Sequence, residues 1–139
     1  RALVPNKDAQ ALAHNVIDAG VDVLIGHHPH VVQGIQRRGR GLILFSVGNF
    51  LLRGARNMSM LGPDMDFGAA VRLAYDVQEQ RLRTLELVPL YDMHRVVIPL
   101  EPDAARDRVR RVNRRSATLG AGAVKLEIDP ATGFGVAQF

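Results

Sequence analysis

The sequence predicts a mixed α/β (α+β) fold in a single domain that occupies residues 1–139. In two segments, 7–19 and 103–119, apolar residues recur at helical spacing, which predicts two amphipathic helices. Short runs of Val, Ile and Leu lie between and after them, bounded by turn residues, as expected for β-hairpins. A chain of 139 residues is long enough to bury one hydrophobic core.

The first helix is predicted to begin after Asn6, whose side chain can cap it, and to end at Gly20. Residues 21–25 are then predicted to form a short buried strand. This strand ends at Gly26 and leads directly into a histidine-rich loop at 27–30. The expected inner face of the helix consists of Ala9, Leu12, Ala13, Val16 and Ile17.

Three hairpins are expected in the rest of the chain: 31–36 with 42–45, 67–77 with 82–89, and 124–128 with 134–139. A short extended piece at 96–100 precedes the second helix. Residues 52–66 show no clear period and predict a loop, and loops of that length in compact domains are often functional. The expected inner stripe of the second helix consists of Ala105, Val109, Val112 and Leu119.

The amino-acid composition restricts the chemistry of the chain. It contains no cysteine, which excludes disulfides, thiolate metal sites and cysteine nucleophiles. Any metal site must therefore use His, Asp, Glu or Asn side chains. No apolar run reaches the ~20 residues that a membrane-spanning helix needs, and this chain shows no signal peptide or lipidation motif.

The net charge of +4 is concentrated in the second helix. Six Arg and two Asp lie between Asp103 and Arg115, which leaves the rest of the chain balanced. The favoured interpretation is a solvated helix face, and the alternative is a surface that binds nucleic acid or an anionic polymer. Because an aromatic content of 5% offers little for base stacking, no nucleic-acid partner is expected.

Three of the five histidines lie within four positions, at the end of the first predicted strand. In α/β proteins, ligands commonly bind at the ends of strands. Pro29, between His28 and His30, fixes one φ angle and favours an extended conformation at His28. Two imidazoles held in this way can offer nitrogens to one metal ion or to two neighbouring ions, and imidazole suits Zn, Mn and Fe.

The simpler interpretation of a loop histidine is a solvated or hydrogen-bonded side chain. It is preferred for His14, on the polar side of the first helix, and for His94, but it explains three adjacent histidines poorly. Two ligands do not complete a metal site, since three or four are normal. Asp64 and Asp66 form the nearby acidic cluster, either as ligands or, as is commoner, as turn formers.

Two motifs give the chain a resemblance to a known family. The segment 26–34, Gly-His-His-Pro-His-Val-Val-Gln-Gly, is followed at 43–50 by Ile-Leu-Phe-Ser-Val-Gly-Asn-Phe. As a pair they resemble the "GxHPHxxQ … YSLGNF" motifs of the bacterial CapA or PgsA family of poly-γ-glutamate capsule biosynthesis. The stretch 10–23 and the tail from Val88-Pro89 onwards are also similar, so the resemblance extends over nearly the whole chain.

The resemblance implies a fold and a set of site residues. The family is similar to calcineurin-like metallophosphoesterases, so the chain is expected to be the C-terminal part of a four-layer αββα sandwich with a dinuclear metal site. His28 and His30 would match the metal-binding His-x-His pair of such enzymes, with His27 as the alternative first ligand. Asn49 and Ser46 are expected either to line the site or to serve turn geometry and packing.

The earlier motifs of the family, which supply Asp, Asn, Glu and His, do not occur in this sequence. We therefore expect the other metal ligands to lie upstream of Arg1. By the same reasoning, this fragment alone is expected to be inactive, to lack part of the sandwich, and to leave a sheet edge unpaired.

Two functions remain as alternatives, so whether the protein is an enzyme stays open. By the resemblance, the complete domain would use two divalent ions (Mn, Fe or Zn) to hydrolyse a phosphate ester, with His28, His30 and Asn49 as catalytic residues. Arg53 and Arg56 could bind phosphate oxygens or remain solvated. Alternatively, the protein binds an anionic polymer such as poly-γ-glutamate, or a capsule synthase partner. The resemblance implies an exported or membrane-associated location at the cell surface.

Overall fold

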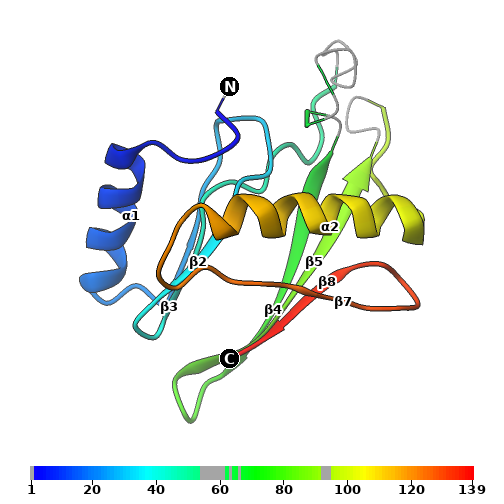
Figure 1. Cartoon of the computed structure of the whole chain (residues 1–139). Helices are drawn as coiled ribbons and strands as arrows, with labels where there is room; N and C mark the ends of the chain where they lie inside the picture. Colours follow the sequence, from blue (N-terminus) through cyan, green and yellow to red (C-terminus); the bar gives the residue numbers. More distant parts are fainter. Residues whose placement is uncertain (1, 54–61, 63, 66, 92–94) are drawn as a thin grey trace.

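The computed structural model describes residues 2–53, 62, 64–65, 67–91 and 95–139, and within them it confirms a mixed α/β fold with two helices and two sheets (Figure 1). The elements, in chain order, are α1 (Lys7–Asp18), β1 (Val23–Ile25), β2 (Ile35–Arg38), β3 (Gly41–Leu44), β4 (Gly68–Asp76), β5 (Arg81–Tyr91), β6 (Ile98–Pro99), α2 (Pro102–Ala117), β7 (Glu127–Ile128) and β8 (Gly135–Gln138). Most of the predicted loop 52–66 lies outside the described residues.

The ends of α1 confirm the local signals in the sequence. The Asn6 side chain accepts a hydrogen bond from the Ala9 N–H at 2.8 Å, and Gly20 follows the helix with φ +105°. The predicted inner face is wrong in part, because Leu12 is 66% exposed while Ala13 and Ile17 are buried. His14 is half-buried, and its Nε2 lies 2.8 Å from Oε1 of the buried Gln36, which agrees with the hydrogen-bonded role preferred for it.

The first sheet has the strand order β1-β3-β2. β1 runs parallel to β3, and β2 and β3 form the predicted hairpin. β1 is shorter than predicted and is not buried, since Ile25 is 43% exposed. The expected strand at 31–34 is also wrong, because Val32 forms an isolated bridge with Val47 and only residues from Ile35 onwards pair with β3.

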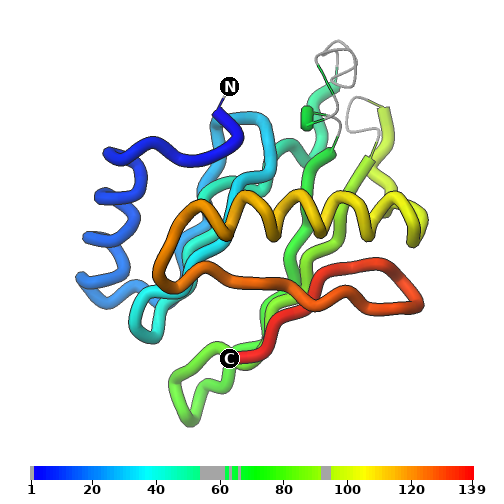
Figure 2. Tube along the Cα trace, viewed as in Figure 1, coloured from blue at the N-terminus to red at the C-terminus, as the bar shows by residue number. Residues whose placement is uncertain are grey.

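The second sheet has the order β4-β5-β8-β7, with β6 paired to β5. The predicted hairpins β4–β5 and β7–β8 are confirmed. The last hairpin is shorter than expected, because the segment that precedes β7 bonds to the first sheet: the Val124 N–H donates to the Ile35 carbonyl and the Gly122 carbonyl accepts from Arg37 N–H. Figure 2 shows this segment running back beneath α2. The chain from 122 to 128 therefore connects the two sheets through main-chain hydrogen bonds.

The two helices cover opposite sides of the first sheet. α1 packs Ala13 and Ile17 on Ile43 and Phe45, in a small apolar cluster. α2 lies across β2 of one sheet and β5 of the other, as Figure 1 shows. Its inner face closes one core shared by both sheets, which includes Val32, Leu44, Phe67, Leu85, Val109, Val112 and Leu126. This shared core fixes where the loops at the strand ends can lie.

The Arg-rich helix is not simply a solvated face, because Arg115 is only 6% exposed. Its guanidinium donates to the Val32 carbonyl and to Asp64, the latter at 2.5 Å, and lies 5.6 Å from the centre of the Phe67 ring. Burial lowers the pKa of Arg115, and the charge of Asp64 opposes that effect. Asp64 therefore holds a buried cation, a role that turn propensity did not predict.

Acid is expected to weaken the turn between β4 and β5. The Asp76 carboxylate accepts N–H groups of Glu79 and Gln78 and pairs with Arg83, and these contacts, led by the Glu79 hydrogen bond, hold the pKa of Asp76 below its usual 3.8. A depressed pKa stabilises the fold above the unfolded-state pKa, and that stability is lost as the pH falls through the folded-state value. The Tm of Asp76→Asn should lie below that of the natural chain at about pH 6, and the two should converge as the pH falls below the lowered pKa of Asp76. A gap in Tm that stays constant with pH would contradict this.

Candidate metal centre

Main-chain hydrogen bonds fix the point at which the histidine loop leaves β1. The Gly26 N–H donates to the Leu44 carbonyl at 2.7 Å, and the Gly26 carbonyl accepts from Val47 N–H at 3.2 Å. The backbones approach so closely here that a Cβ on Gly26 would stand 2.1 Å from the Phe45 carbonyl oxygen. Only glycine fits this position. The loop at 27–30 therefore starts from a rigid end beside the segment 45–49.

The backbone of the histidine loop is strained at two positions. His28 has φ +89° and His30 has φ +61°. Both values lie in the left-handed region that side chains other than glycine rarely occupy. The extended conformation expected at His28 is therefore wrong: the preference imposed by Pro29 is overridden by the turn that brings residues 31–33 back towards Val47. Strain of this kind concentrates at binding and active sites.

Asn49 fixes the orientation of the His30 ring. Its Oδ1 lies 2.7 Å from His30 Nδ1. Because an amide oxygen only accepts hydrogen bonds, Nδ1 must carry the proton, and Nε2 keeps its lone pair for a metal ion or a proton. Asn49 is 8% exposed, and its Nδ2 has no hydrogen-bond partner among the described residues. A buried donor without an acceptor is costly, and it suits an anionic oxygen bound beside His30.

Neighbouring residues hold Asn49 in place. The chain at Gly68 passes so close that a Cβ there would lie 1.7 Å from the Asn49 carbonyl oxygen. Ser46, which is buried, accepts a hydrogen bond from the Gly48 N–H at 3.2 Å. Of the two alternatives open for Ser46, turn geometry is therefore the one with a contact to support it.

All three clustered histidines line one open hollow of about 610 Å³, with residues from the N-terminal segment on its other side. The ring centres of His28 and His30 are 6.3 Å apart. Two rings that share one tetrahedral ion, with metal–nitrogen bonds of about 2 Å, have centres roughly 5 Å apart. At the observed separation, the two rings could bind one ion after a small movement towards each other. They could also each bind one of two neighbouring ions. His27 lines the same hollow, so the choice of first ligand stays between His27 and His28.

The described residues do not complete a metal site. They contain no group of three or more His, Asp or Glu side chains placed to hold an ion together. Asp64 is engaged with Arg115, and Arg53 is exposed at the last described position before the gap. Arg56, Asp66 and His94 lie outside the described residues. The two imidazoles could supply two of the ligands of a metal ion, and the other ligands would have to come from residues outside the described part of the chain.

Comparison with known proteins places this hollow in a family. Residues 2–53 match the family described as "Bacterial capsule synthesis protein PGA_cap". That span contains both the histidine loop and the Asn49 segment. Over this N-terminal stretch the chain is similar to the PGA_cap family. Within the described part of the chain, no helix is long and apolar enough to cross a membrane.

Similarity to relatives extends beyond the matched span. The chain is 27% identical to "Capsule biosynthesis protein CapA" of Bacillus anthracis, over 84% of this chain and 26% of that protein. It is 43% identical to "PGA biosynthesis protein CapA" of Bacillus subtilis (strain 168), over 34% of this chain and 12% of that protein. An "Uncharacterized protein y4sH" of Sinorhizobium fredii is 45% identical over 40% of this chain. The chain thus spans about a quarter or less of the length of these relatives.

Sequence reasoning missed one residue at the hollow, Gln33. Its side chain is 4% exposed, and its Nε2 donates to the Ala2 carbonyl at 2.9 Å. Gln33 directly follows the histidine loop in the chain, so this hydrogen bond connects the N-terminal segment to that loop. The signal was present, because a glutamine occupies the last place of the GxHPHxxQ motif.

Proposed function

We propose that the complete protein is a metal-dependent phosphoesterase of the capsule, or poly-γ-glutamate, synthesis type, and that His28 and His30 supply two of its metal ligands. The observation that carries the proposal is the hydrogen bond from His30 Nδ1 to Asn49 Oδ1, which makes Nε2 the ring nitrogen that can bind a metal ion. A histidine that binds a metal usually donates its other ring N–H to an oxygen acceptor, and here the amide oxygen of the buried Asn49 takes that place. The loop strain at His28 and His30 is a further reason.

Each residue has a defined part in this proposal. His28 and His30 hold metal, with His27 as the alternative to His28. Asn49 sets the tautomer of His30, and its Nδ2–H, which has no partner among the described residues, would donate to a phosphate oxygen. When bound, a pair of Mn, Fe or Zn ions activates water for attack on phosphorus. Arg53, which is exposed, would attract an anionic substrate.

The remaining ligands and the rest of a four-layer αββα sandwich would come from the part of the protein that this chain does not contain. Two features support that arrangement. β1 is an edge strand, paired only to β3 among the described residues. Leu12, Val21 and Ile25, on α1 and around β1, are 66%, 40% and 43% exposed, an apolar area that a further layer would cover. A location at the cell surface belongs to the same proposal.

The second candidate is a non-catalytic role in capsule assembly, in which the protein binds an anionic polymer or a capsule synthase partner. The α2 face as a whole gives it limited support, because four of its six arginines are engaged. Arg106 pairs with Asp103, Arg108 and Arg111 pair with Asp107, and Arg115 is buried. Only Arg110 and Arg114 remain exposed and without a partner in the described part of the chain.

The test is hydrolysis of a generic phosphodiester by the full-length protein after treatment with EDTA and re-addition of Mn. We expect turnover only with metal, and none in the double variant His28→Gly/His30→Gly. Glycine is chosen because it accepts the positive φ angles of both positions without strain. Metal-dependent turnover that survives the double substitution would reject the assignment of these residues.

A further inference from the structure

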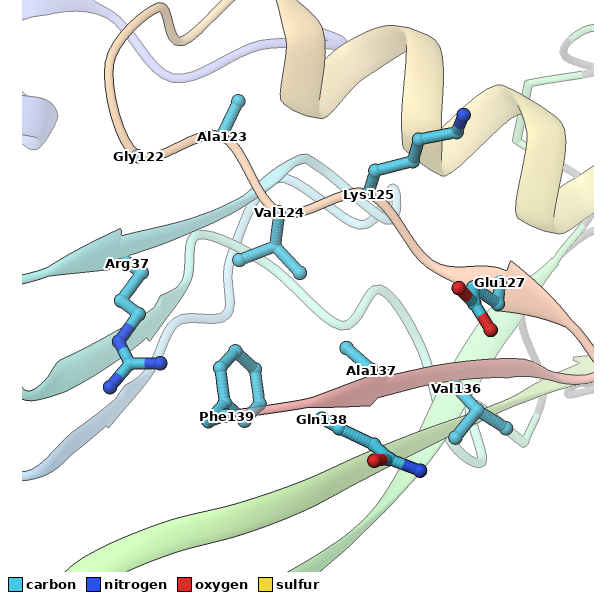
Figure 3. A pocket seen from close by; sticks show the side chains of 10 residues that line it. All are labelled: Arg37, Gly122, Ala123, Val124, Lys125, Glu127, Val136, Ala137, Gln138 and Phe139. Carbon is cyan, nitrogen blue, oxygen red and sulfur yellow. The ribbon is translucent and has the colours of Figure 1, made fainter.

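A second candidate binding surface lies on the opposite end of the first sheet, around residues 122–125. Two hollows flank this segment and share the residues Ala123, Val124 and Lys125 as a common wall. One hollow, of about 310 Å³, lies against the C-terminal half of α2. The other, of about 560 Å³, opens between this segment and β8 (Figure 3). We name the two hollows together with their shared wall the 122–125 surface.

The 122–125 surface carries three cations without an ion pair among the described residues, although Arg37 Nε donates to the Gly39 carbonyl at 3.3 Å. Arg114 and Lys125 line the smaller hollow, and Arg37 and Lys125 line the larger one. Neither Arg114 nor Lys125 has an ion pair or side-chain hydrogen bond in the described part of the chain. Figure 3 shows Lys125 reaching towards α2 and Arg37 standing beside Phe139, whose ring centre is 5.1 Å from the guanidinium carbon. A single acidic residue, Glu127, lies at the far end of the larger hollow.

The position of Arg110 adds to this charge at some cost to the helix. Arg110 and Arg114 are four residues apart on α2, so they lie on the same face, and both are exposed. Like charges at this spacing destabilise a helix. The other arginines of α2 are compensated by Asp64, Asp103 or Asp107, whereas this pair is not. An anionic ligand bound over the pair would remove the repulsion.

The floor of the smaller hollow is apolar. Ala117, Ala123 and Val124 form it, with Arg114 and Lys125 at its rim, and the one neutral polar residue, Asn113, is occupied by hydrogen bonds to the Leu126 backbone. Such a site suits a ligand that alternates methylene groups with anionic groups. Aromatic residues on which bases could stack are absent from its lining, which argues against a single-stranded nucleic acid.

From these observations we propose that the 122–125 surface binds a flexible polycarboxylate chain, with its carboxylates on Arg114, Lys125 and Arg37 and its aliphatic parts on the apolar floor. The proposal deepens the second candidate function and does not depend on the metal chemistry of His28 and His30. It places polymer binding at the edge of α2 and the 122–125 segment, away from the histidine hollow, with which it shares no lining residue.

Fluorescence anisotropy with labelled oligomers tests this proposal on the full-length protein. The probes are poly-γ-glutamate, poly-α-glutamate and an oligothymidine of equal charge. Arg114→Ser/Lys125→Ser should weaken binding of a polyglutamate roughly tenfold, since each exposed ion pair contributes up to about fivefold in affinity. The matched control, Arg38→Ser/Arg81→Ser, removes the same charge from exposed residues elsewhere and should change affinity less than about twofold.

The outcomes are distinct. Preference for one of the two polyglutamates identifies the backbone that the surface fits, and either preference supports the proposal. Equal losses in both double variants would overturn it, because they would show general electrostatic attraction. Equal or tighter binding of oligothymidine would also overturn it, in favour of a nucleic-acid surface. Thermal unfolding of both double variants, which alter exposed side chains, checks that each is folded.

Discussion

Replacing His28 or His30 with glycine in the full-length protein is expected to weaken metal binding by about a hundredfold or more, since loss of an outer partner alone costs 10–100-fold. The measurement is metal content after gel filtration, together with chelator competition to obtain Kd. Asn49→Ala should weaken binding roughly 10–100-fold, because His30 then loses the acceptor at 2.7 Å that fixes its tautomer.

His27→Ala is the matched control and also decides which histidine is the first ligand. All three rings line the same hollow, but only His28 keeps the one-residue spacing to His30. We expect His27→Ala to change metal affinity less than about threefold, well below the cost of losing a ligand. A loss as large as that of His28→Gly would make His27 a ligand. Full metal content in His30→Gly would remove the metal centre from this loop altogether.

Arg115→Ala is expected to lower the free energy of unfolding by about 3 kcal/mol, because it leaves a void and removes the charged partner of a buried pair. Asp64 is 39% exposed and can be rehydrated, which keeps the loss below the largest values known for buried pairs. Arg115→Met retains most of the volume against Phe67 and should cost about 1–2 kcal/mol less.

The neighbouring Arg114→Ala provides a control for this measurement. Arg114 is exposed and has no partner in the described part of the chain, so its loss should change the free energy of unfolding by less than about 0.5 kcal/mol. Urea denaturation of the three variants gives the comparison. Equal midpoints for Arg114→Ala and Arg115→Ala would show that Arg115 has no role in stability.

The sequence was informative where structure depends on neighbouring residues. The cap at Asn6 and the stop at Gly20 set α1 to within one residue. The strand predictions were wrong where the two pairing segments are distant in the chain. Residues 31–34 have a strand-like composition, but Val32 pairs with Val47 outside the β2–β3 ladder, and Val124 bonds to Ile35 before the β7–β8 hairpin begins. Local propensity contains no information about such partners.

The candidate site was predicted in part for a similar reason. The motif pair identified His28, His30 and Asn49, which the fold brings to one place although Asn49 lies 19 residues after His30. The positive φ angles of both histidines and the burial of Arg115 were not predicted. Each arises from contacts across the fold: the turn towards Val47 in one case, and Phe67, Asp64 and the Val32 carbonyl in the other.

The segment 122–128 has a mechanical consequence. It is bonded to Ile35 and Arg37 at one end and to β8 at the other, with only Lys125 and Leu126 between the two attachments to absorb displacement. The two sheets therefore cannot hinge against each other without breaking one of these attachments. A displacement of β8 is therefore passed through the segment 122–128 to β2 and β3. It then reaches β1, which precedes the histidine loop.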